Sequence, residues 1–254
     1  MTARVVITGA SSGIGKALAV EYARRGAVLG LIARRADLLQ QLAFALKVQT
    51  ALYALDVRDA PGLSRSAKDF CARLGAPDVV IANAGVSAGT STERNEDHAV
   101  FQEILDVNVM GMVNTFMAFL PAMRAAGGGT LVGIASVAGF RGLPGSGAYS
   151  ASKAAAAVYL ESLRVELRGS GVSVVTISPG YIATPMTEHN PYPMPFIIPA
   201  HVAAGRMARA IARRKRHVVI PWQMGIAGRL LRLLPGALYD RVFALAPRKP
   251  RRDH

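Results

Sequence analysis

Short runs of apolar, often β-branched residues alternate with longer helical patterns from the start of the chain to about residue 220. The runs are apolar almost without interruption, which is typical of parallel strands buried on both faces. We therefore expect seven strands, at Val5–Thr8, Val28–Ala33, Thr50–Leu55, Val79–Ala82, Thr130–Ala135, Val172–Ser178 and His217–Ile220.

Helix-sized segments separate these runs and set the fold class. We expect helices at Ile14–Arg25, Ala36–Ala45, Gly62–Leu74, Asp97–Ala126, Ala151–Arg168 and Ala200–Arg213. Strands that alternate with helices imply right-handed crossovers and a doubly wound α/β sheet. The chain of 254 residues suits one large domain, and no internal repeat or low-complexity linker divides it.

One long irregular stretch, residues 180–199, is rich in proline. A loop of that length inside a compact domain is usually functional and often forms a lid, whereas a poorly ordered insertion is the alternative. Its apolar residues would make an adaptable wall if the substrate loop, about residues 180–205, closes over a ligand. A bulky apolar substrate is then expected: a lipid, steroid-like or aromatic carbonyl compound. The alternative is that these side chains only pack the loop onto its own domain. They are Tyr181, Ile182, Met186, Tyr192, Met194, Phe196, Ile197 and Ile198.

The positive charge gathers near the C-terminus. Residues 204–254 hold 13 of the 30 Lys and Arg residues but only two of the 16 Asp and Glu residues. We divide the chain into a catalytic domain, 1–220, and a basic, apolar extension, 221–254, which Pro235 and Gly236 split into two short helices. Neither piece reaches the roughly 20 apolar residues of a membrane-spanning helix.

Three functions are open for this extension. Apolar residues with interspersed arginines suit a helix that lies on an anionic membrane surface. The extension would otherwise cover a substrate pocket or contact another subunit, with a solvated basic tail. Nucleic-acid binding is the third alternative, but no base-stacking pattern or recognised motif supports it.

Location and metal content are also predicted. The N-terminus shows no secretory signal, and the single Cys71 points to a reducing compartment, so we expect a cytoplasmic protein, at most peripheral at the inner face of a membrane. His189 and His201 have no ligand spacing with each other or with a carboxylate cluster, so we expect no catalytic metal.

A glycine-rich turn, Thr8-Gly9-Ala10-Ser11-Ser12-Gly13-Ile14-Gly15, follows the first strand and opens directly into the first helix. Glycines permit a tight turn and close approach of a diphosphate, and the helix N-terminus offers free N–H groups to the anion. The spacing is G-x-x-x-G-x-G rather than the standard dinucleotide motif. Its place between strand and helix nevertheless predicts nucleotide binding.

The end of the second strand bears on the choice of cofactor. Ala33 stands where an NAD site would have a carboxylate, and Arg34 and Arg35 follow. Cations there suit the 2′-phosphate of NADP, although two arginines at a strand end also suit a solvated turn. Asp56 and Val57, after the third strand, are placed to meet the adenine, with helix capping as a competing role for the aspartate.

Tyr149 and Lys153 lie four residues apart in an Ala-rich segment that predicts a helix, so they share one face. A neighbouring cation favours the phenolate and lowers the pKa of a tyrosine. Such a tyrosine exchanges a proton near neutral pH, as general acid–base catalysis requires.

Together these motifs resemble the classical short-chain dehydrogenase/reductase family over roughly residues 3–220. The resemblance rests on Thr8–Gly15, Asn83-Ala84-Gly85, Ser136, Tyr149 with Lys153, and Pro179-Gly180, in that order. It implies a single-domain, seven-stranded Rossmann fold with helices on both faces, and hydride transfer between NAD(P) and a carbonyl or alcohol carbon.

The resemblance also implies four catalytic roles. Tyr149 would be the general acid/base, and Lys153 would lower its pKa and bind the nicotinamide ribose. Ser136 would hold the substrate oxygen. Asn108 would distort its helix and position a water behind the lysine.

Cofactor contacts follow in the same way. Asn83-Ala84-Gly85 would line the adenosine, and Pro179, Gly180, Ile182 and Thr184 would border the nicotinamide. One departure is Ala82, where the family has a first asparagine; its loss would slightly loosen the central strand. Ser12 stands where NADP users often have a basic residue, which leaves Arg34 as the main indication of NADP.

We therefore expect an enzyme that prefers NADP(H), with NAD(H) as the alternative cofactor. The Asp97–Ala126 and Ala151–Arg168 helices resemble those that pair family subunits, so a homodimer or homotetramer is expected. A cofactor-binding regulator without catalysis, associated with a membrane or with nucleic acid, is the alternative function.

Overall fold

The computed structural model describes residues 2–188, 190 and 192–251; His189 therefore lies outside the described residues. The described part contains one parallel sheet of seven strands. The strands lie in the order β3 (Thr50–Ala54), β2 (Val28–Ala33), β1 (Arg4–Thr8), β4 (Val79–Ala82), β5 (Gly129–Ile134), β6 (Val172–Pro179) and β9 (His217–Ile220). Each predicted strand is present to within one residue at either end, and the doubly wound α/β fold is confirmed.

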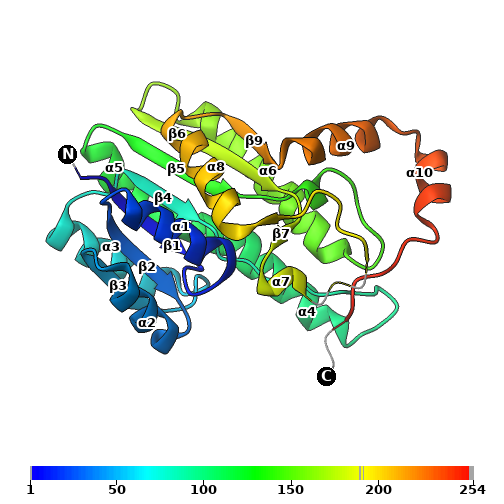
Figure 1. Ribbon diagram of the computed structural model, residues 1–254, viewed down its shortest axis with the longest axis horizontal. Coiled ribbons are helices and arrows are strands. Elements are labelled where there is room, and N and C mark those ends of the chain that lie inside the picture. The colour runs from blue at the N-terminus through cyan, green and yellow to red at the C-terminus, as the bar shows by residue number, and fades with distance from the viewer. Residues whose placement is uncertain (1, 189, 191, 252–254) are drawn as a thin grey trace.

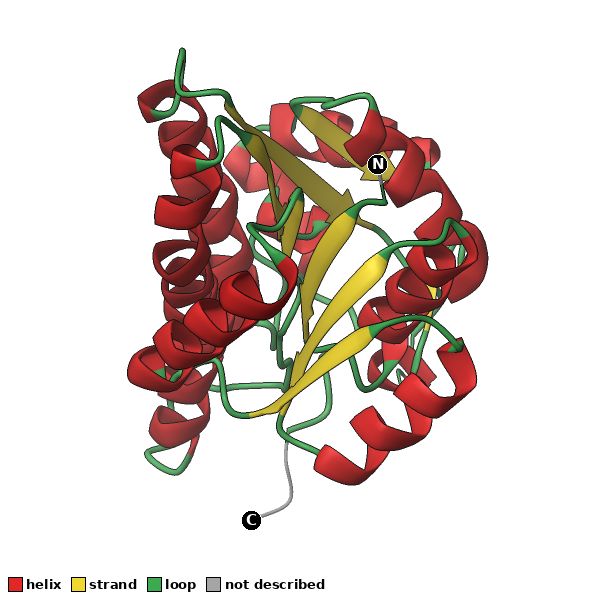
Figure 2. Cartoon of the chain, turned by 90° about the vertical axis from the view of Figure 1, so that its left-hand side faces the viewer, coloured by secondary structure: helices red, strands yellow, loops and turns green. Residues whose placement is uncertain are grey.

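Helices cover both faces of the sheet (Figures 1 and 2). Apolar side chains of β1 explain the uninterrupted runs, because Val5 and Ile7 join one core and Val6 joins the other. The first core is completed by α1 (Gly13–Arg24), α2 (Ala36–Leu46) and α8 (Ala200–Ala212). The second is completed by α3 (Ala60–Leu74), α5 (Gly111–Ala125) and α6 (Gly147–Glu166).

The long helix predicted at 97–126 is interrupted. It consists of α4 (Asp97–Leu105), a π-helical turn η1 (Asp106–Met110) and α5. Among the described residues, 97–125 is the stretch whose length and hydropathy would suit a membrane span. In the structure this stretch packs into the second core, where its Phe116, Phe119 and Met123 are buried.

The proline-rich loop is more ordered than its sequence indicates. Two short strands, β7 (Ile182–Ala183) and β8 (Ile198–Pro199), pair in parallel, and a single helical turn, α7 (Pro185–Glu188), lies between them. The prediction of one irregular stretch is corrected, because strand pairing closes the loop at its base.

The C-terminal extension forms an arm that projects from the domain (Figure 1). It contains α9 (Trp222–Leu233) and α10 (Gly236–Phe243), separated at Pro235 as predicted. At the base of the arm Gly228 lies against the Phe140 ring, where any Cβ would overlap it. At its outer end Arg141 lies over the Tyr239 ring, 4.1 Å from its centroid, and the Tyr239 hydroxyl donates to the Gly142 carbonyl.

Candidate active site

A cleft opens at the carboxyl ends of the strands, where the chain reverses its winding between β1 and β4. It brings together nearly every residue predicted for the cofactor and for catalysis. Its lining includes Gly9, Ser11, Ser12, Gly13, Ile14, Arg34, Arg35, Asp56, Val57, Asn83, Ala84, Gly85, Ser136, Tyr149, Lys153, Pro179, Gly180, Ile182 and Thr184. The two other predicted residues, Gly15 and Asn108, are not part of the lining.

The glycine-rich turn is packed against the loop that follows β4. Gly9 has a φ of 65°, and a Cβ there would lie 2.8 Å from the Ala84 Cα. A Cβ at Gly15 would overlap the Gly9 carbonyl oxygen. The Asn83 amide nitrogen donates to the carbonyl oxygens of Thr8, at 3.0 Å, and Gly9, at 3.3 Å. Two of the motif glycines are therefore required by internal packing.

Thr8 is a site residue that the sequence prediction did not single out. Its Oγ1 accepts from the backbone N–H groups of Asn83, at 3.0 Å, and Ala84, at 3.1 Å. This joins the end of β1 to the loop after β4. Ala82, the departure from the family pattern, still pairs with Gly133 in the β4–β5 register, so the ladder is continuous there.

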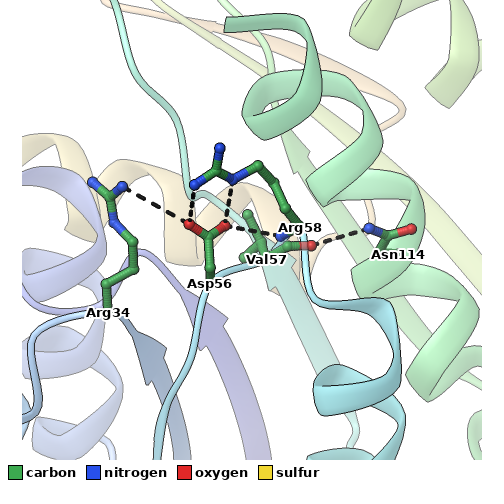
Figure 3. Close-up of polar contacts among 5 residues, drawn as sticks. All are labelled: Arg34, Asp56, Val57, Arg58 and Asn114. Atoms are coloured by element: carbon green, nitrogen blue, oxygen red, sulfur yellow. Dashed lines mark hydrogen bonds and ion pairs between the residues drawn. The ribbon is translucent and has the colours of Figure 1, made fainter. Parts of the chain in front are cut away.

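Arginine side chains surround the end of the cleft beside β2 and β3. Arg35 donates from Nη2 to the hydroxyls of Ser11, at 3.1 Å, and Ser12, at 3.0 Å. It thus supplies a cation beside Ser12, where the sequence indicated that one was missing. Arg34 Nη1 lies 3.8 Å from Asp56 Oδ2 (Figure 3).

Asp56 is held by Arg58, a contact the sequence prediction missed (Figure 3). Arg58 donates to it from its backbone nitrogen at 2.9 Å, from Nε at 3.1 Å and from Nη2 at 2.8 Å. These hydrogen bonds hold the pKa of the Asp56 carboxyl below its usual range. The competing capping role is wrong, because Asp59 caps α3 through the Gly62 N–H.

The catalytic candidates meet at the other end of the cleft. Ser136 follows β5, and its Oγ accepts from the Ala138 N–H at 3.1 Å and lies 3.4 Å from the Pro179 carbonyl oxygen. Helix α6 begins at Gly147, so both Tyr149 and Lys153 are helical and share its face. The Lys153 ammonium is buried, donates to the Ile134 carbonyl at 2.8 Å and lies 5.8 Å from the Tyr149 ring centroid.

Burial determines the acidity of this pair. It raises the pKa of Tyr149, an effect that the hydrogen bond with Ser136 opposes. Desolvation of the ammonium lowers the pKa of Lys153 to about 8. The sequence predicted that the lysine would lower the pKa of the tyrosine. In the structure the pKa of Tyr149 is raised instead, because burial removes the phenolate from water.

Asn108 lies in the π-helical turn, as the family resemblance predicts. Its side chain accepts from the Val86 N–H at 2.8 Å and donates to the Val86 carbonyl at 3.0 Å and to the Ser152 hydroxyl at 2.9 Å. Ser152, fully buried, donates in turn to the Tyr149 carbonyl at 2.7 Å. Ser152 was missed, because a serine among small helical residues gives no signal of its own.

Comparison with known proteins agrees with this geometry. The family described as short chain dehydrogenase matches residues 3–193. The chain belongs to the short-chain dehydrogenase family. An uncharacterized oxidoreductase of Myxococcus xanthus is 42% identical over 238 residues, which cover 92% of this chain and 94% of the relative.

Two solved structures illustrate the likeness of this short-chain dehydrogenase to cofactor complexes. L-sorbose reductase from Gluconobacter frateurii, complexed with NADPH and L-sorbose, has a TM-score of 0.78 and 26% identity, and the match covers 86% of this chain and 95% of that one. A short chain dehydrogenase from Mycobacterium paratuberculosis bound to NAD has a TM-score of 0.76 and 27% identity, with coverage of 86% and 96%.

Family membership makes this short-chain dehydrogenase an NAD(P)-dependent oxidoreductase of alcohol and carbonyl groups. Its cleft fits a nicotinamide dinucleotide. No side-chain hydrogen bond caps the N-terminus of α1, so the N–H groups there are free to meet a diphosphate, and Gly13, at a φ of 55°, keeps the approach open. The three candidates for catalysis, Ser136, Tyr149 and Lys153, line the same cleft.

Proposed function

We propose that this enzyme is an NADP(H)-preferring carbonyl reductase or alcohol dehydrogenase with a bulky, apolar substrate and with Tyr149 as general acid/base. One observation carries the proposal. Ser136, Tyr149 and Lys153 converge at one end of a cleft whose other end presents the glycine-rich turn, Arg34 and Arg35.

The roles follow from the contacts. The bound cofactor supplies or accepts the hydride. The Ser136 hydroxyl orients the substrate oxygen, and Tyr149 protonates that oxygen in the reductive direction. The Lys153 ammonium, fixed on the Ile134 carbonyl, stabilises charge beside the phenol, and Asn108 with Ser152 holds the backbone around the tyrosine.

The test is a panel of carbonyl compounds ordered by increasing apolar size, followed through oxidation of NADPH and of NADH. We expect turnover with NADPH and a loss of at least about a hundredfold in Tyr149→Phe, because general acid catalysis typically contributes that much. Binding of NADPH, measured by its fluorescence, is the control for folding. A native protein that binds NADPH and reduces nothing in the panel would favour the alternative, a regulator without catalysis.

Apolar side chains of residues 180–199 support the proposed substrate class, with Met186 in the lining of the cleft and the others elsewhere on the same loop. Met186 lines the cleft and is 44% exposed, and Phe196 and Ile197 are 54% and 43% exposed. The Tyr181 and Tyr192 rings contact each other, with centroids 6.4 Å apart. Flexible methionine and rigid aromatic side chains suit a large apolar body.

A homodimer or homotetramer is proposed from the exposed apolar surface of α5 and α6. Met117 is 68% exposed, and Val158 and Val165 are 67% and 65% exposed. The two helices are neighbours, because Phe116 and Tyr159 stack between them. A second copy of the chain would cover this surface through a four-helix contact.

For the extension we propose contact with the anionic surface of a membrane, from the cytoplasmic side. In α9 the exposed Trp222, Ile226, Leu230 and Leu233 recur at helical spacing. Leu238, Val242 and Leu245 extend the apolar surface along and past α10. Arginines at 229, 232 and 241 would meet lipid phosphates. The division into a catalytic domain, 1–220, and an extension, 221–254, is part of this proposal.

A further inference from the structure

The last described residues, 244–251, which we call the C-terminal tail, return from the arm to the domain. The tail passes from α10 to the region of α4 (Figure 1). Gly89 donates from its backbone nitrogen to the Pro250 carbonyl at 2.8 Å and forms a parallel bridge with Arg251. A Cβ at Gly89 would overlap the Lys249 carbonyl oxygen, so a glycine is required for this approach. The tail therefore contacts its own domain through its last residues, although most of its side chains are exposed.

An ion pair between the exposed Arg251 and the buried Asp97 fixes the end of the tail. The Arg251 guanidinium donates to both carboxylate oxygens of Asp97, from Nε at 2.8 Å and from Nη2 at 2.9 Å. Asp97 is 3% exposed and also accepts from the Ser91 N–H at 2.7 Å. Two parallel hydrogen bonds between planar groups fix orientation as well as distance. The position of Lys249, two residues earlier, is thereby set.

Lys249 extends from the tail toward the catalytic tyrosine. Its ammonium donates to the Ser87 hydroxyl at 2.7 Å and lies 5.6 Å from the Tyr149 ring centroid. Partial burial lowers the pKa of Lys249, and among residues 2–188, 190 and 192–251 no carboxylate forms an ion pair with it. A cation partly withdrawn from water gains most when an anion joins it.

The space around this ammonium adjoins the reaction site. Lys249 and Pro250 line a small pocket with Gly85, Val86, Ser87, Pro185, Met186 and Asn190. Gly85, Val86, Pro185 and Met186 also line the main cleft, whereas Lys249 does not. Lys153, the other cation beside the Tyr149 ring, lines the main cleft and is bound to Ile134. The two lysines thus approach the tyrosine from two adjoining pockets.

We infer that Lys249, with Ser87, binds an anionic substituent of the carbonyl substrate. The substrate class is then an oxo acid: an apolar body, a reducible carbonyl and a carboxylate a few bonds away. Met186 contacts the apolar body, Tyr149 and Ser136 meet the carbonyl oxygen, and Lys249 meets the carboxylate. This inference rests on the proposed carbonyl reductase function.

The experiment compares an acid with its neutral methyl ester on the same carbon skeleton, using the full chain and NADPH. Two pairs place the carboxylate at different distances from the carbonyl: phenylglyoxylate with methyl phenylglyoxylate, and levulinate with methyl levulinate. The readout is the ratio of kcat/KM for acid over ester within each variant, which cancels any effect common to both substrates. The variants are Lys249→Gln, which keeps a donor to Ser87, Lys249→Arg, which keeps the charge, and Arg248→Gln, which removes the exposed neighbouring cation.

We expect the native enzyme to prefer at least one acid to its ester. Lys249→Gln should lower that ratio roughly tenfold or more, as loss of a charged hydrogen bond implies, while Lys249→Arg keeps most of it and Arg248→Gln leaves it unchanged. Binding of the preferred acid to the NADP-loaded enzyme, measured by calorimetry, should weaken in Lys249→Gln only.

Two negative results are distinguishable. In the first, the native enzyme reduces the esters, but Lys249→Gln leaves the acid-to-ester ratio unchanged for both pairs. This result would overturn the role of Lys249 and leave the reductase function standing. A native enzyme that reduces neither acids, nor esters, nor any neutral carbonyl compound would overturn the proposed function, and this inference with it.

Discussion

At the scale of single residues, burial shifts the pKa values of Tyr149 and Lys153, the pair that we propose for catalysis. It favours the neutral form of both groups, because it raises the pKa of Tyr149 and lowers that of Lys153 to about 8. At neutral pH the tyrosine is therefore a protonated phenol and the lysine is still mostly an ammonium. This combination suits donation of a proton to a carbonyl oxygen, which is the reductive direction.

The arginines beside β2 give a prediction on cofactor choice. Arg34→Ala and Arg35→Ala should each raise the KM for NADPH, roughly tenfold or more, and change the KM for NADH much less, because each removes a cation available to the 2′-phosphate. Initial rates with both cofactors provide the measurement. Arg25→Ala, which removes an exposed arginine paired with Glu21 on α1, is the matched control. A native preference for NADH, or equal effects on both cofactors, would contradict the assignment.

At the scale of elements, local distortions place the side chains. The π-helical turn of residues 106–110 lies between two regular helices, and it brings Asn108 to Val86 and Ser152. The first turn of α1 depends in the same way on glycine, since a side chain at Gly15 would meet the Gly9 carbonyl. Neither Asn108 nor Gly15 lines the cleft, but their neighbours Val107 and Gly13 do, so both irregular points lie directly behind it.

Two helical glycines, one in a crowded position and one in an open position, give a prediction at this scale. Gly15→Ala should lower the free energy of unfolding by about 1–3 kcal/mol, as overpacking does, and should weaken NADPH binding. Gly205→Ala, in the interior of α8, places its Cβ in open space, with only the end of Arg209 nearby, and should raise stability by about 0.5–1 kcal/mol. Urea denaturation measures both changes. If both substitutions changed the free energy of unfolding alike, close packing would not be the reason for a glycine at position 15.

At the scale of the whole molecule, exposed apolar side chains gather on two separate surfaces. One lies on α5 and α6 and the other on α9 and α10. We propose different partners for them: a second copy of the chain for the first, and a membrane surface for the second, whose apolar residues recur along α9. The tail then folds back from the arm, where Arg251 pairs with Asp97, and its Lys249 and Pro250 line the pocket beside Tyr149.

Substitutions on one surface serve as the control for substitutions on the other. Met117→Lys with Val158→Lys should convert the oligomer to monomers in sedimentation velocity and leave binding to anionic liposomes unchanged. Trp222→Ser with Leu230→Ser should weaken liposome binding and leave the oligomer intact, because apolar insertion is lost. If the first variant remains an oligomer, the α5–α6 surface is not the contact between subunits. If the second variant binds liposomes as well as the native protein does, the α9–α10 surface does not bind the membrane.

Much of the fold could be predicted because it depends on local patterns. Continuous apolar runs specify parallel strands, and glycine, proline and the spacing of Tyr149 and Lys153 mark turns and a helical face. The family motifs then placed Ser136, Asn108 and the cofactor residues, and the structure brings nearly all of them to one cleft. Boundaries shifted by a few residues, as at α6, because tertiary packing extends a helix beyond its strongest pattern.

What the sequence by itself determined was the doubly wound sheet, the family and the set of residues that line the cleft at the ends of the strands. Only the tertiary structure decided which side chains meet across the chain: Arg35 with Ser12, Arg58 with Asp56, Ser152 with Asn108, and Lys249 with Ser87. It also reversed the expected shift of the Tyr149 pKa and brought the tail, for which the sequence left three functions open, against the loop that holds Ser87 and Gly89. The physical reason is that periodicity records which face is buried, whereas desolvation and long-range hydrogen bonds depend on neighbours that are distant in sequence.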